Sequence, residues 1–170
     1  MKRKLKFILL VVIGLPQMVL GQTEFETSEY PNLQFTILDS SAKTAEVCFK
    51  GTAPKHWELA LPGTVVNPND GQTYTVTEIA NDAFAYTSRL EKITIPGTIV
   101  RIGEYAFTGT NLMSVDFSAA TSLTELPKNC FSNCYGLAGD NVSLRGTNCR
   151  RADQQWQAIP RGQSDTDGRR

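Results

Sequence analysis

Residues 90–107 read LEKITIPGTIVRIGEYAF, and most of this stretch is written again on both sides of it. Its second half, IGEYAF at residues 102–107, has counterparts in IANDAF at 79–84 and in LPKNCF at 126–131. Its first half, Leu-x-x-Ile-x-Ile, recurs at Leu90, Ile93 and Ile95, at Leu112, Val115 and Phe117, and more loosely at Leu137, Val142 and Leu144. A fixed period in the twenties is typical of repeat proteins, in which each unit buries its apolar side chains against its neighbours.

One repeat cannot fold alone. Seven large apolar side chains in residues 90–112 would each stabilise the fold by roughly 1.5–3 kcal/mol when buried, whereas ordering about 23 residues costs roughly 1–2 kcal/mol for each backbone. Stacking of the repeats has to supply the difference. The sequence therefore predicts a strand-dominated solenoid, with a short parallel β-sheet on one face and turns or short helical segments on the other.

The first 21 residues have the pattern of a secretory signal peptide. A basic start precedes an apolar run at residues 7–13 and a small-residue cleavage site at residues 19–21, the basic residues being Lys2, Arg3, Lys4 and Lys6. A membrane anchor is the alternative, but the run is shorter than the about 20 apolar residues that a spanning helix needs. We expect residues 1–21 to be removed and the mature chain to be exported to the cell surface, the extracellular space or the periplasm, without a transmembrane segment.

The formal net charge of zero hides an acidic mature chain. Removing the signal peptide leaves 13 basic against 17 acidic residues, and residues 22–144 have 7 against 14, a net charge of −7. A nucleic-acid-binding surface needs the opposite sign. We therefore expect no nucleic-acid partner.

Residues 22–55 precede the repeats. Residues 23–29, TEFETSE, are polar and acidic and predict a short flexible lead-in. Residues 32–38 and 44–49 alternate apolar and polar side chains around a polar turn, which predicts a β-hairpin. At this position the hairpin would cap the first edge of the repeat array, which needs such a cover.

Residues 56–144 hold about three repeats and the beginning of a fourth. Their predicted strands are 58–61, 92–95 and 114–117. The first repeat is interrupted at residues 65–74, where turn residues between β-formers predict an inserted hairpin. A calcium loop using Asn67, Asn69 and Glu78 is the alternative, but Gly71 and Gln72 do not fit an EF-hand.

Alternation along the strands predicts which side chains face outward. Ile93 and Ile95 point into the interior, whereas the neighbouring positions line the exposed face of the sheet. The candidate partner-binding residues on this face are Glu58, Lys92, Thr94, Ser114 and Asp116.

The repeat pattern is lost after Leu144. Transferring the spacing of the second repeat places its core positions on mostly polar residues, namely Asn148, Arg151, Gln155, Trp156 and Arg161. Residues 145–170 are basic, polar and rich in turn residues, a composition typical of disorder. We interpret them as a disordered or frame-altered tail.

Two of the four cysteines fit the repeat. Cys130 takes the position of Ala83 and Ala106, and Cys134 falls three residues after Phe131, where small interior side chains are wanted. Buried thiols are therefore expected. A disulfide and a metal site at Cys130-x-x-x-Cys134 are the alternatives, the latter without a second ligand pair.

No set of residues indicates catalysis. A nucleophile needs a neighbouring base, and His56, the one histidine, fits better as a surface residue. Paired carboxylates of the kind that hydrolyse glycosides remain open, because acidic residues are plentiful: Glu58, Glu78, Asp82, Glu104, Asp116 and Glu125. No glycine-rich phosphate loop occurs in the sequence. We expect no enzyme, no cofactor and no metal.

The repeats resemble the BspA-type leucine-rich repeat family of bacterial cell-surface proteins, whose unit runs close to LxxIxIPxxVxxIGxxAFxxCxxL. The resemblance covers about residues 30–144 and includes Cys134 at the cysteine of the family. Ser118 in place of a proline and Pro127 in place of Gly103 make the third repeat irregular.

The resemblance implies an exported leucine-rich-repeat solenoid that binds protein partners, such as host matrix proteins or other cells, and is not an enzyme. A carbohydrate-binding accessory of a glycan-uptake system is the alternative function. Aromatic side chains gathered in a groove would favour it, and we expect the available ones, Trp57, Tyr74, Tyr86 and Tyr105, to lie on different sides of the repeat.

Overall fold

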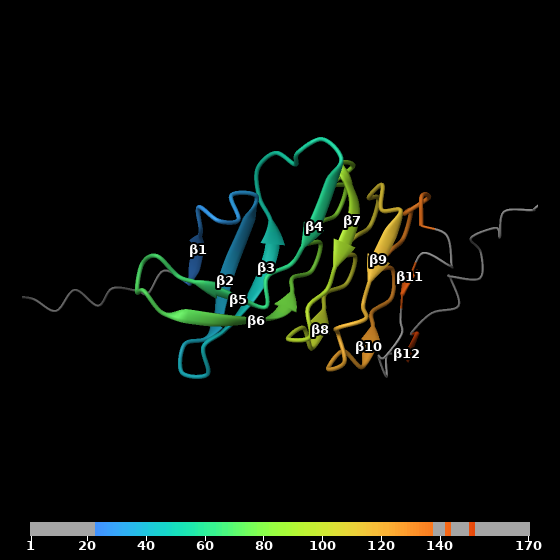
Figure 1. The fold of residues 1–170 in the computed structure, drawn as a ribbon. Coiled ribbons are helices and arrows are strands. Elements are labelled where there is room, and N and C mark those ends of the chain that lie inside the picture. Colours follow the sequence, from blue (N-terminus) through green and yellow to red (C-terminus); the bar gives the residue numbers. More distant parts are fainter. Residues whose placement is uncertain (1–22, 138–141, 144–149, 152–170) are drawn as a thin grey trace, which may run out of the picture.

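The structure is a computed structural model that describes residues 23–137, 142–143 and 150–151. Every regular element in these residues is a β-strand, and no helix occurs among them. A six-stranded sheet lies at one end, and a row of strands from the repeats extends beside it (Figure 1). The predicted strand-dominated fold is therefore confirmed, whereas the short helical segments are absent from the described part of the chain.

Alternating apolar and polar residues form the six-stranded sheet. Its strands are β1 (Glu24–Glu26), β2 (Leu33–Asp39), β3 (Thr44–Phe49), β5 (Thr64–Val66), β6 (Thr73–Ile79) and β8 (Arg101–Ile102). Antiparallel pairing joins β1 to β2, β2 to β3 and β5 to β6, whereas β6 pairs in parallel with both β3 and β8. The hairpin predicted at residues 32–38 and 44–49 is β2–β3, and through β3 and β6 it continues the parallel pairing of the repeats.

The predicted flexible lead-in at residues 23–29 is wrong. Strand β1 pairs with β2, and Phe25 is only 4% exposed. The Phe25 ring stacks on Phe35, with ring centroids 5.5 Å apart, and lies 5.8 Å from Tyr74. One buried aromatic residue between two glutamates is enough to hold an edge strand in the sheet. Side chains alternate along a strand, so the two glutamates reach water while Phe25 packs inside.

The hairpin predicted within the first repeat is present as β5–β6, with Val65 opposite Tyr74. Asn67 shapes its turn: its side-chain oxygen accepts the Asn69 N–H at 2.9 Å, and its own N–H donates to the carbonyl of Gln72 at 2.9 Å. The hairpin does not simply project from the repeat. Its strands extend the N-terminal sheet, and Tyr74 is buried there.

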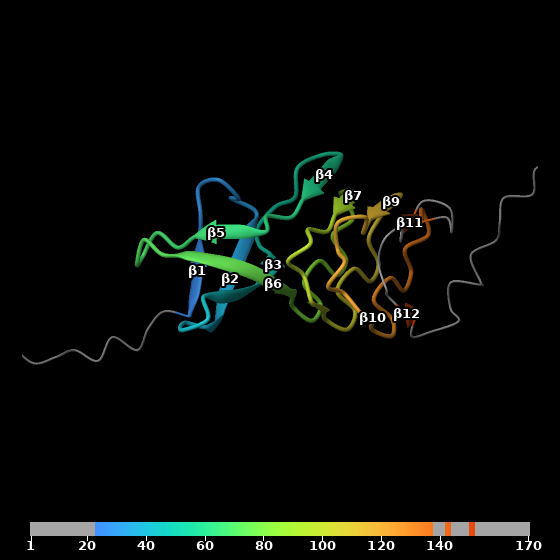
Figure 2. The same ribbon diagram turned by 60° about the horizontal axis from the view of Figure 1, so that its bottom comes forward.

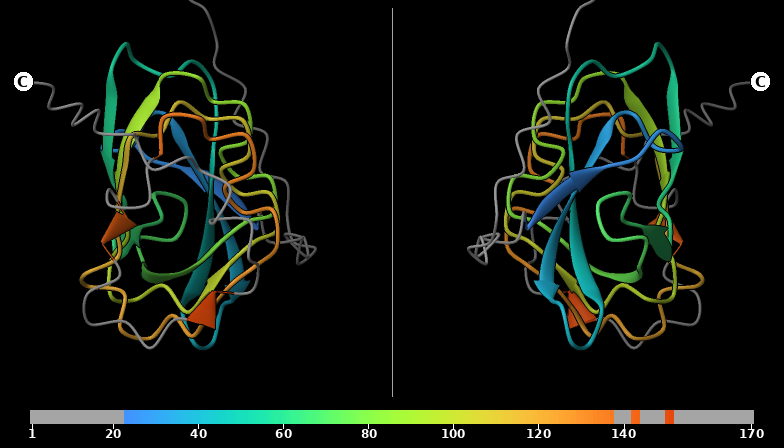
Figure 3. Two further views of the ribbon diagram at one scale, coloured as in Figure 1. Left: turned by 90° about the vertical axis from the view of Figure 1, so that its right-hand side faces the viewer. Right: turned by 90° about the vertical axis from the view of Figure 1, so that its left-hand side faces the viewer.

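Each repeat contributes one strand to a second, all-parallel sheet. Its strands are β4 (Trp57–Ala60), β7 (Leu90–Thr94), β9 (Ser114–Asp116) and β11 (Val142–Ser143). The first three agree with the predicted strands to within two residues. We call residues 57–89, 90–111 and 112–136 the first, second and third coils; viewed end-on, they nearly superpose (Figure 3).

The return side of each coil consists of turns that bond to the next coil. The N–H groups of Asp82, Phe84 and Tyr86 donate to carbonyls of the second coil at 3.0, 2.7 and 2.7 Å. Gly103 permits this close stacking, because a Cβ there would lie 2.4 Å from the Asn81 nitrogen. Hydrogen bonds thus hold neighbouring coils together on both sides.

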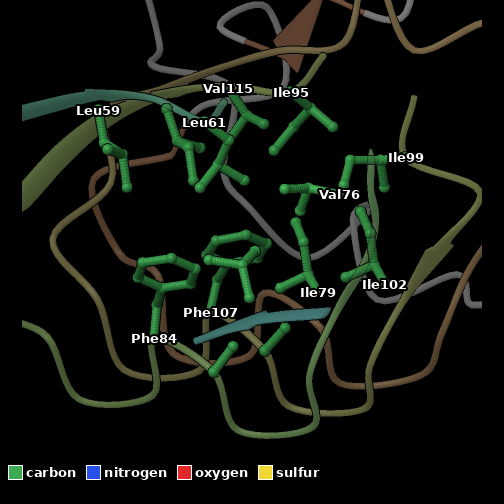
Figure 4. Close-up of a cluster of buried hydrophobic side chains, with 14 of the residues drawn as sticks. Leu59, Leu61, Val76, Ile79, Phe84, Ile95, Ile99, Ile102, Phe107 and Val115 are labelled. Atoms are coloured by element: carbon green, nitrogen blue, oxygen red, sulfur yellow. The ribbon is translucent and has the colours of Figure 1, made fainter. Parts of the chain in front are cut away.

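The repeated sequence pattern places one phenylalanine of each coil in the interior. Phe107 is fully buried between Phe84 and Phe131, with ring centroids 5.4 and 5.1 Å away and nearly parallel planes. Side chains from the strands, such as Leu59 and Val115, lie across the interior from Phe84 and Phe107 (Figure 4). The core therefore runs along the stack, between the parallel sheet and the turns.

Cys130 and Cys134 are both buried, as the repeat predicts. The Cys134 thiol donates to the Phe107 carbonyl at 3.0 Å and lies 3.2 Å from the Thr110 hydroxyl. Burial raises the pKa of Cys134. This thiol is a small interior group, and no ion-binding set of three or more His, Cys, Asp or Glu surrounds it or any other described residue.

The pairing of the coils reaches beyond residue 144. Strand β12 (Arg150–Arg151) pairs in parallel with β10 (Glu125–Leu126), and Arg151 lies opposite Leu126. Leu126 is the counterpart of Ile102 in the third coil. The pairing therefore places Arg151 at the next counterpart of Ile102, the same position that the spacing of the second repeat assigns to it. The other residues of the predicted tail, 145–149 and 152–170, lie outside the described part of the chain.

Candidate functional site

The five predicted partner-binding residues lie on one face of the parallel sheet. Glu58, Lys92 and Ser114 pair across β4, β7 and β9 as one rung, and Ala60, Thr94 and Asp116 form the next. The residues between these rungs, Leu59, Ile93 and Val115, are buried. The three strands lie in one row, so their alternate side chains form a continuous outward surface (Figure 2).

Charges on this sheet face are paired but open to water. The Lys92 ammonium lies 2.7 Å from a Glu58 carboxylate oxygen, and the two side chains are 52% and 63% exposed. The hydrogen bond to Glu58 raises the pKa of Lys92. Because exposed ion pairs are weak and are screened by salt, both groups remain available to a partner.

Asp116 supplies a fixed negative charge on the second rung. Its carboxylate accepts the Ser118 N–H at 2.8 Å, and this hydrogen bond lowers the pKa of Asp116. The side chain is therefore ionised at neutral pH. The sheet face combines this charge with the hydroxyls of Thr94 and Ser114, a mixed polar surface.

His56 and Glu78, which the sequence raised as a candidate base and a candidate calcium ligand, both pair with other charged side chains. The imidazole of His56 is 83% exposed and lies 2.7 Å from a Glu91 carboxylate oxygen. Glu78, the third residue of the calcium-loop alternative, lies on β6 and forms an ion pair with Arg101 instead. These groups are held by charge pairing on the surface.

The four aromatic side chains lie in different parts of the molecule: Trp57 on β4, Tyr74 on β6, and Tyr86 and Tyr105 in turns. Trp57 and Tyr74 are buried, whereas Tyr86 is 76% and Tyr105 41% exposed. These two exposed tyrosines lie on the same side, in the turns of neighbouring coils. The repeat itself contains a signal for this. The position of Tyr86 is occupied in the other coils by Gly109 and Asn133, and that of Tyr105 by Asp82 and Asn129, all of which are turn residues.

Sequence reasoning also missed a shallow hollow of about 480 Å³ that is lined by residues of all three coils. Its polar lining includes Asn81, Arg101, Glu104, Thr124 and Glu125. Pro127, which takes the position of Gly103, is part of its wall, so the hollow lies where the third repeat departs from the pattern. Arg101 is already paired with Glu78 and, at 4.0 Å, with Glu46.

A family model described as the BspA type leucine rich repeat region matches residues 72–148 in six copies. Residues 72–148 are BspA-type leucine-rich repeats. The match starts in the inserted hairpin, covers strands β7 to β11 and confirms the resemblance drawn from residues 90–107. A comparison with curated proteins gives no match.

Solved structures similar to this chain are also leucine-rich repeat proteins. One from Bacteroides ovatus ATCC 8483 has a TM-score of 0.56 and 21% identity over 71% of this chain, which spans 32% of that protein. A leucine-rich cell surface protein from Faecalibacterium prausnitzii A2-165 has a TM-score of 0.41 and 19% identity, over 75% of this chain and 50% of its own. A leucine-rich repeat protein from Bacteroides capillosus ATCC 29799 also has a TM-score of 0.41 and 19% identity, over 77% of this chain and 99% of that protein.

The similarity to the Bacteroides ovatus protein supports the fold of the BspA-type repeats and nothing finer. This chain spans about a third of that protein. In the described part of the chain, we find no helix with the length and apolar character needed to cross a membrane.

Proposed function

We propose that this chain is an exported repeat module that binds protein partners through its sheet face, Glu58, Lys92, Thr94, Ser114 and Asp116. Leucine-rich repeats point to protein–protein interaction, and the family is generally non-enzymatic. The partners we propose are host extracellular matrix proteins or other cells. The signal-peptide pattern at residues 1–21 supports export to the cell surface.

The observation that carries this proposal is the register of β4, β7 and β9. It brings five side chains from three coils onto one surface, although they lie up to 58 residues apart in the chain, from Glu58 to Asp116. Extended surfaces of this kind are what stacked repeats use to bind partners. The mixed charges favour contacts that are modest in strength and sensitive to salt.

The same proposal gives the rest of the chain its roles. The coils form a short solenoid, and the β2–β3 hairpin caps it, with β3 covering the open edge of β6. Residues 22–55 are then the cap, residues 56–144 the repeats and residues 145–170 the tail. A covered edge keeps a repeat array from pairing with a second chain.

The test is surface capture of a panel of purified extracellular matrix proteins by the mature chain. The wild type is compared with the double variant Lys92→Glu/Asp116→Lys at low and physiological salt. Capture should fall with salt and should be weaker in the variant, which should stay folded because neither side chain faces the core. Equal capture by both proteins would remove the sheet face as the site.

A further inference from the structure

A second surface repeats along the turn side of the coils. Two backbone positions in each turn have positive φ: Asp82 and Tyr86 (54° and 58°), Tyr105 and Gly109 (57° and 68°), and Asn129 and Asn133 (both 60°). Hydrogen bonds between the coils align these turns, for example Tyr86 N–H to Thr108 and Gly109 N–H to Ser132. The six residues, here called the turn grid, therefore form two rows: Asp82, Tyr105 and Asn129, and Tyr86, Gly109 and Asn133.

The turn grid places one tyrosine ring against the backbone of the next coil. A Cβ built on Gly109 would lie 2.7 Å from Cδ1, 3.0 Å from Cε1 and 3.6 Å from Cγ of Tyr86. These distances put one edge of the ring in contact with Gly109. Tyr86 is nevertheless 76% exposed, so most of its surface is open to solvent.

The second tyrosine has hydrogen-bonding groups beside it. The Asn129 amide donates to the Tyr105 hydroxyl at 3.2 Å, and the Ser132 hydroxyl donates to the Asn129 side-chain oxygen at 3.2 Å. The carboxylate of Asp82 is exposed one coil away in the same row as Tyr105. The exposed Tyr105 ring therefore lies in one row with the Asn129 amide and the Asp82 carboxylate.

Tyrosine is an unfavourable residue for these positions. Positive φ suits Gly, Asn and Asp, and it is uncommon for bulky side chains. The other four grid positions follow this rule, whereas Tyr86 and Tyr105 break it and also leave aromatic surface in water. Strain of this kind is found where a side chain has a task besides packing.

We propose that the turn grid binds a neutral oligosaccharide, with the Tyr86 and Tyr105 rings stacking on sugar rings and Asp82 and Asn129 bonding to hydroxyls. Binding sites for small polar ligands combine aromatic surface with a few fixed polar groups. The turn grid contains no lysine or arginine to attract an anionic ligand. It contains no aliphatic side chain to build a protein interface.

This site is separate from the sheet face. Leu59 and Val115, on the strands, lie across the core from Phe84 and Phe107, which belong to the same turns as the grid (Figure 4). The two surfaces are therefore on opposite sides of the stack. Binding at one can be removed without touching the other.

The test is isothermal titration calorimetry of the mature chain with three neutral probes: cellohexaose, xylohexaose and maltohexaose. At least one should bind, and Tyr86→Ala and Tyr105→Ala should each weaken it about tenfold, as expected for the loss of one stacked ring. Tyr86→Phe keeps the ring and should bind within a factor of about two. Val66→Ala is the control, because Val66 is 56% exposed on β5 of the N-terminal sheet and lies outside the turn grid.

Three results would overturn the proposal. These are no binding of any probe at millimolar concentration, equal loss in the Val66→Ala variant, and full binding by both Tyr86→Ala and Tyr105→Ala. Capture of matrix proteins is measured on the same variants and should be unchanged. If capture falls while no probe binds, the turn grid is instead a protein contact.

Discussion

The two ends of the molecule are built from the same kind of strand but are joined differently. In the N-terminal sheet, β1, β2 and β3 pair antiparallel with their neighbours in sequence. In the coils, each strand pairs in parallel with the strand one repeat away. The first arrangement ends at the edge strand β1, whereas the second continues from one repeat to the next. Strand β6 connects them, because it pairs with β5 in the hairpin and with β3 and β8 in the parallel ladder.

This difference shows where a single substitution should matter most. A coil position touches the equivalent positions on both sides, as Phe107 touches Phe84 and Phe131. An edge residue of the N-terminal sheet has neighbours on one side only. The coil core should therefore be the most sensitive part of the chain, and the exposed turns of the N-terminal sheet the least.

The largest effect is expected for Phe107→Ala, which should lower the free energy of unfolding by about 3–5 kcal/mol because it leaves a cavity between two stacked rings. This is a large share of the stability of a small protein. Urea denaturation followed by circular dichroism measures it, with Thr94→Ala on the exposed rung as the control. An unchanged midpoint and slope for Phe107→Ala would mean that the repeat frame is wrongly assigned.

A smaller effect is expected for Gly103→Ala. The new Cβ would lie 2.4 Å from the Asn81 nitrogen and 2.5 Å from the Ala80 carbonyl, so the first and second coils must separate. Overpacking of this kind costs about 1–3 kcal/mol. Gly63→Ala is the matched control, since its nearest contact would be an ordinary 3.4 Å to a Thr98 methyl. Thermal melting of the two variants should separate them, and equal melting temperatures would argue against close stacking at Gly103.

The smallest effect is expected for Asp39→Asn, in the exposed β2–β3 turn. The Ser41 and Ala42 N–H groups bond to the Asp39 carboxylate and lower its pKa from the ordinary 3.8. Its stabilising contribution is present above the unfolded-state pKa and is lost as pH falls through the lower folded-state pKa. Unfolding measured between neutral pH and pH about 2 should thus be less acid-sensitive in the variant. Identical pH profiles would show that the turn contributes nothing.

The repeat made most of the fold predictable. Ile93, Val115 and Phe107 follow from periodicity alone, and so do the outward positions of Lys92 and Asp116. Phe25 was missed, because one apolar residue among polar ones carries no periodic signal and its partner Phe35 is set by the tertiary fold. The shared side of Tyr86 and Tyr105 was not predicted, because the positive φ of their positions appears only when all three coils are aligned.

The sheet face could be predicted because strand alternation and register are both fixed by the repeat. The hollow beside Pro127 could not, since it depends on how side chains from three coils pack around a local departure from the repeat. The hydrogen bond that fixes Asp116 was likewise hidden, because it comes from Ser118, where the family pattern has a proline.

The central claim is that partners bind at the exposed face of the coil sheet. Charged side chains elsewhere on the protein do not bind them. This claim is tested most directly by capture of matrix proteins by two charge-swapped variants that keep the net charge: Lys92→Glu/Asp116→Lys on the coil sheet, and Lys50→Glu/Glu26→Lys at the exposed ion pair of the N-terminal sheet. Both should stay folded, because none of the four side chains faces the core. We predict that the first loses capture and the second retains it; equal capture by the two variants would contradict the claim.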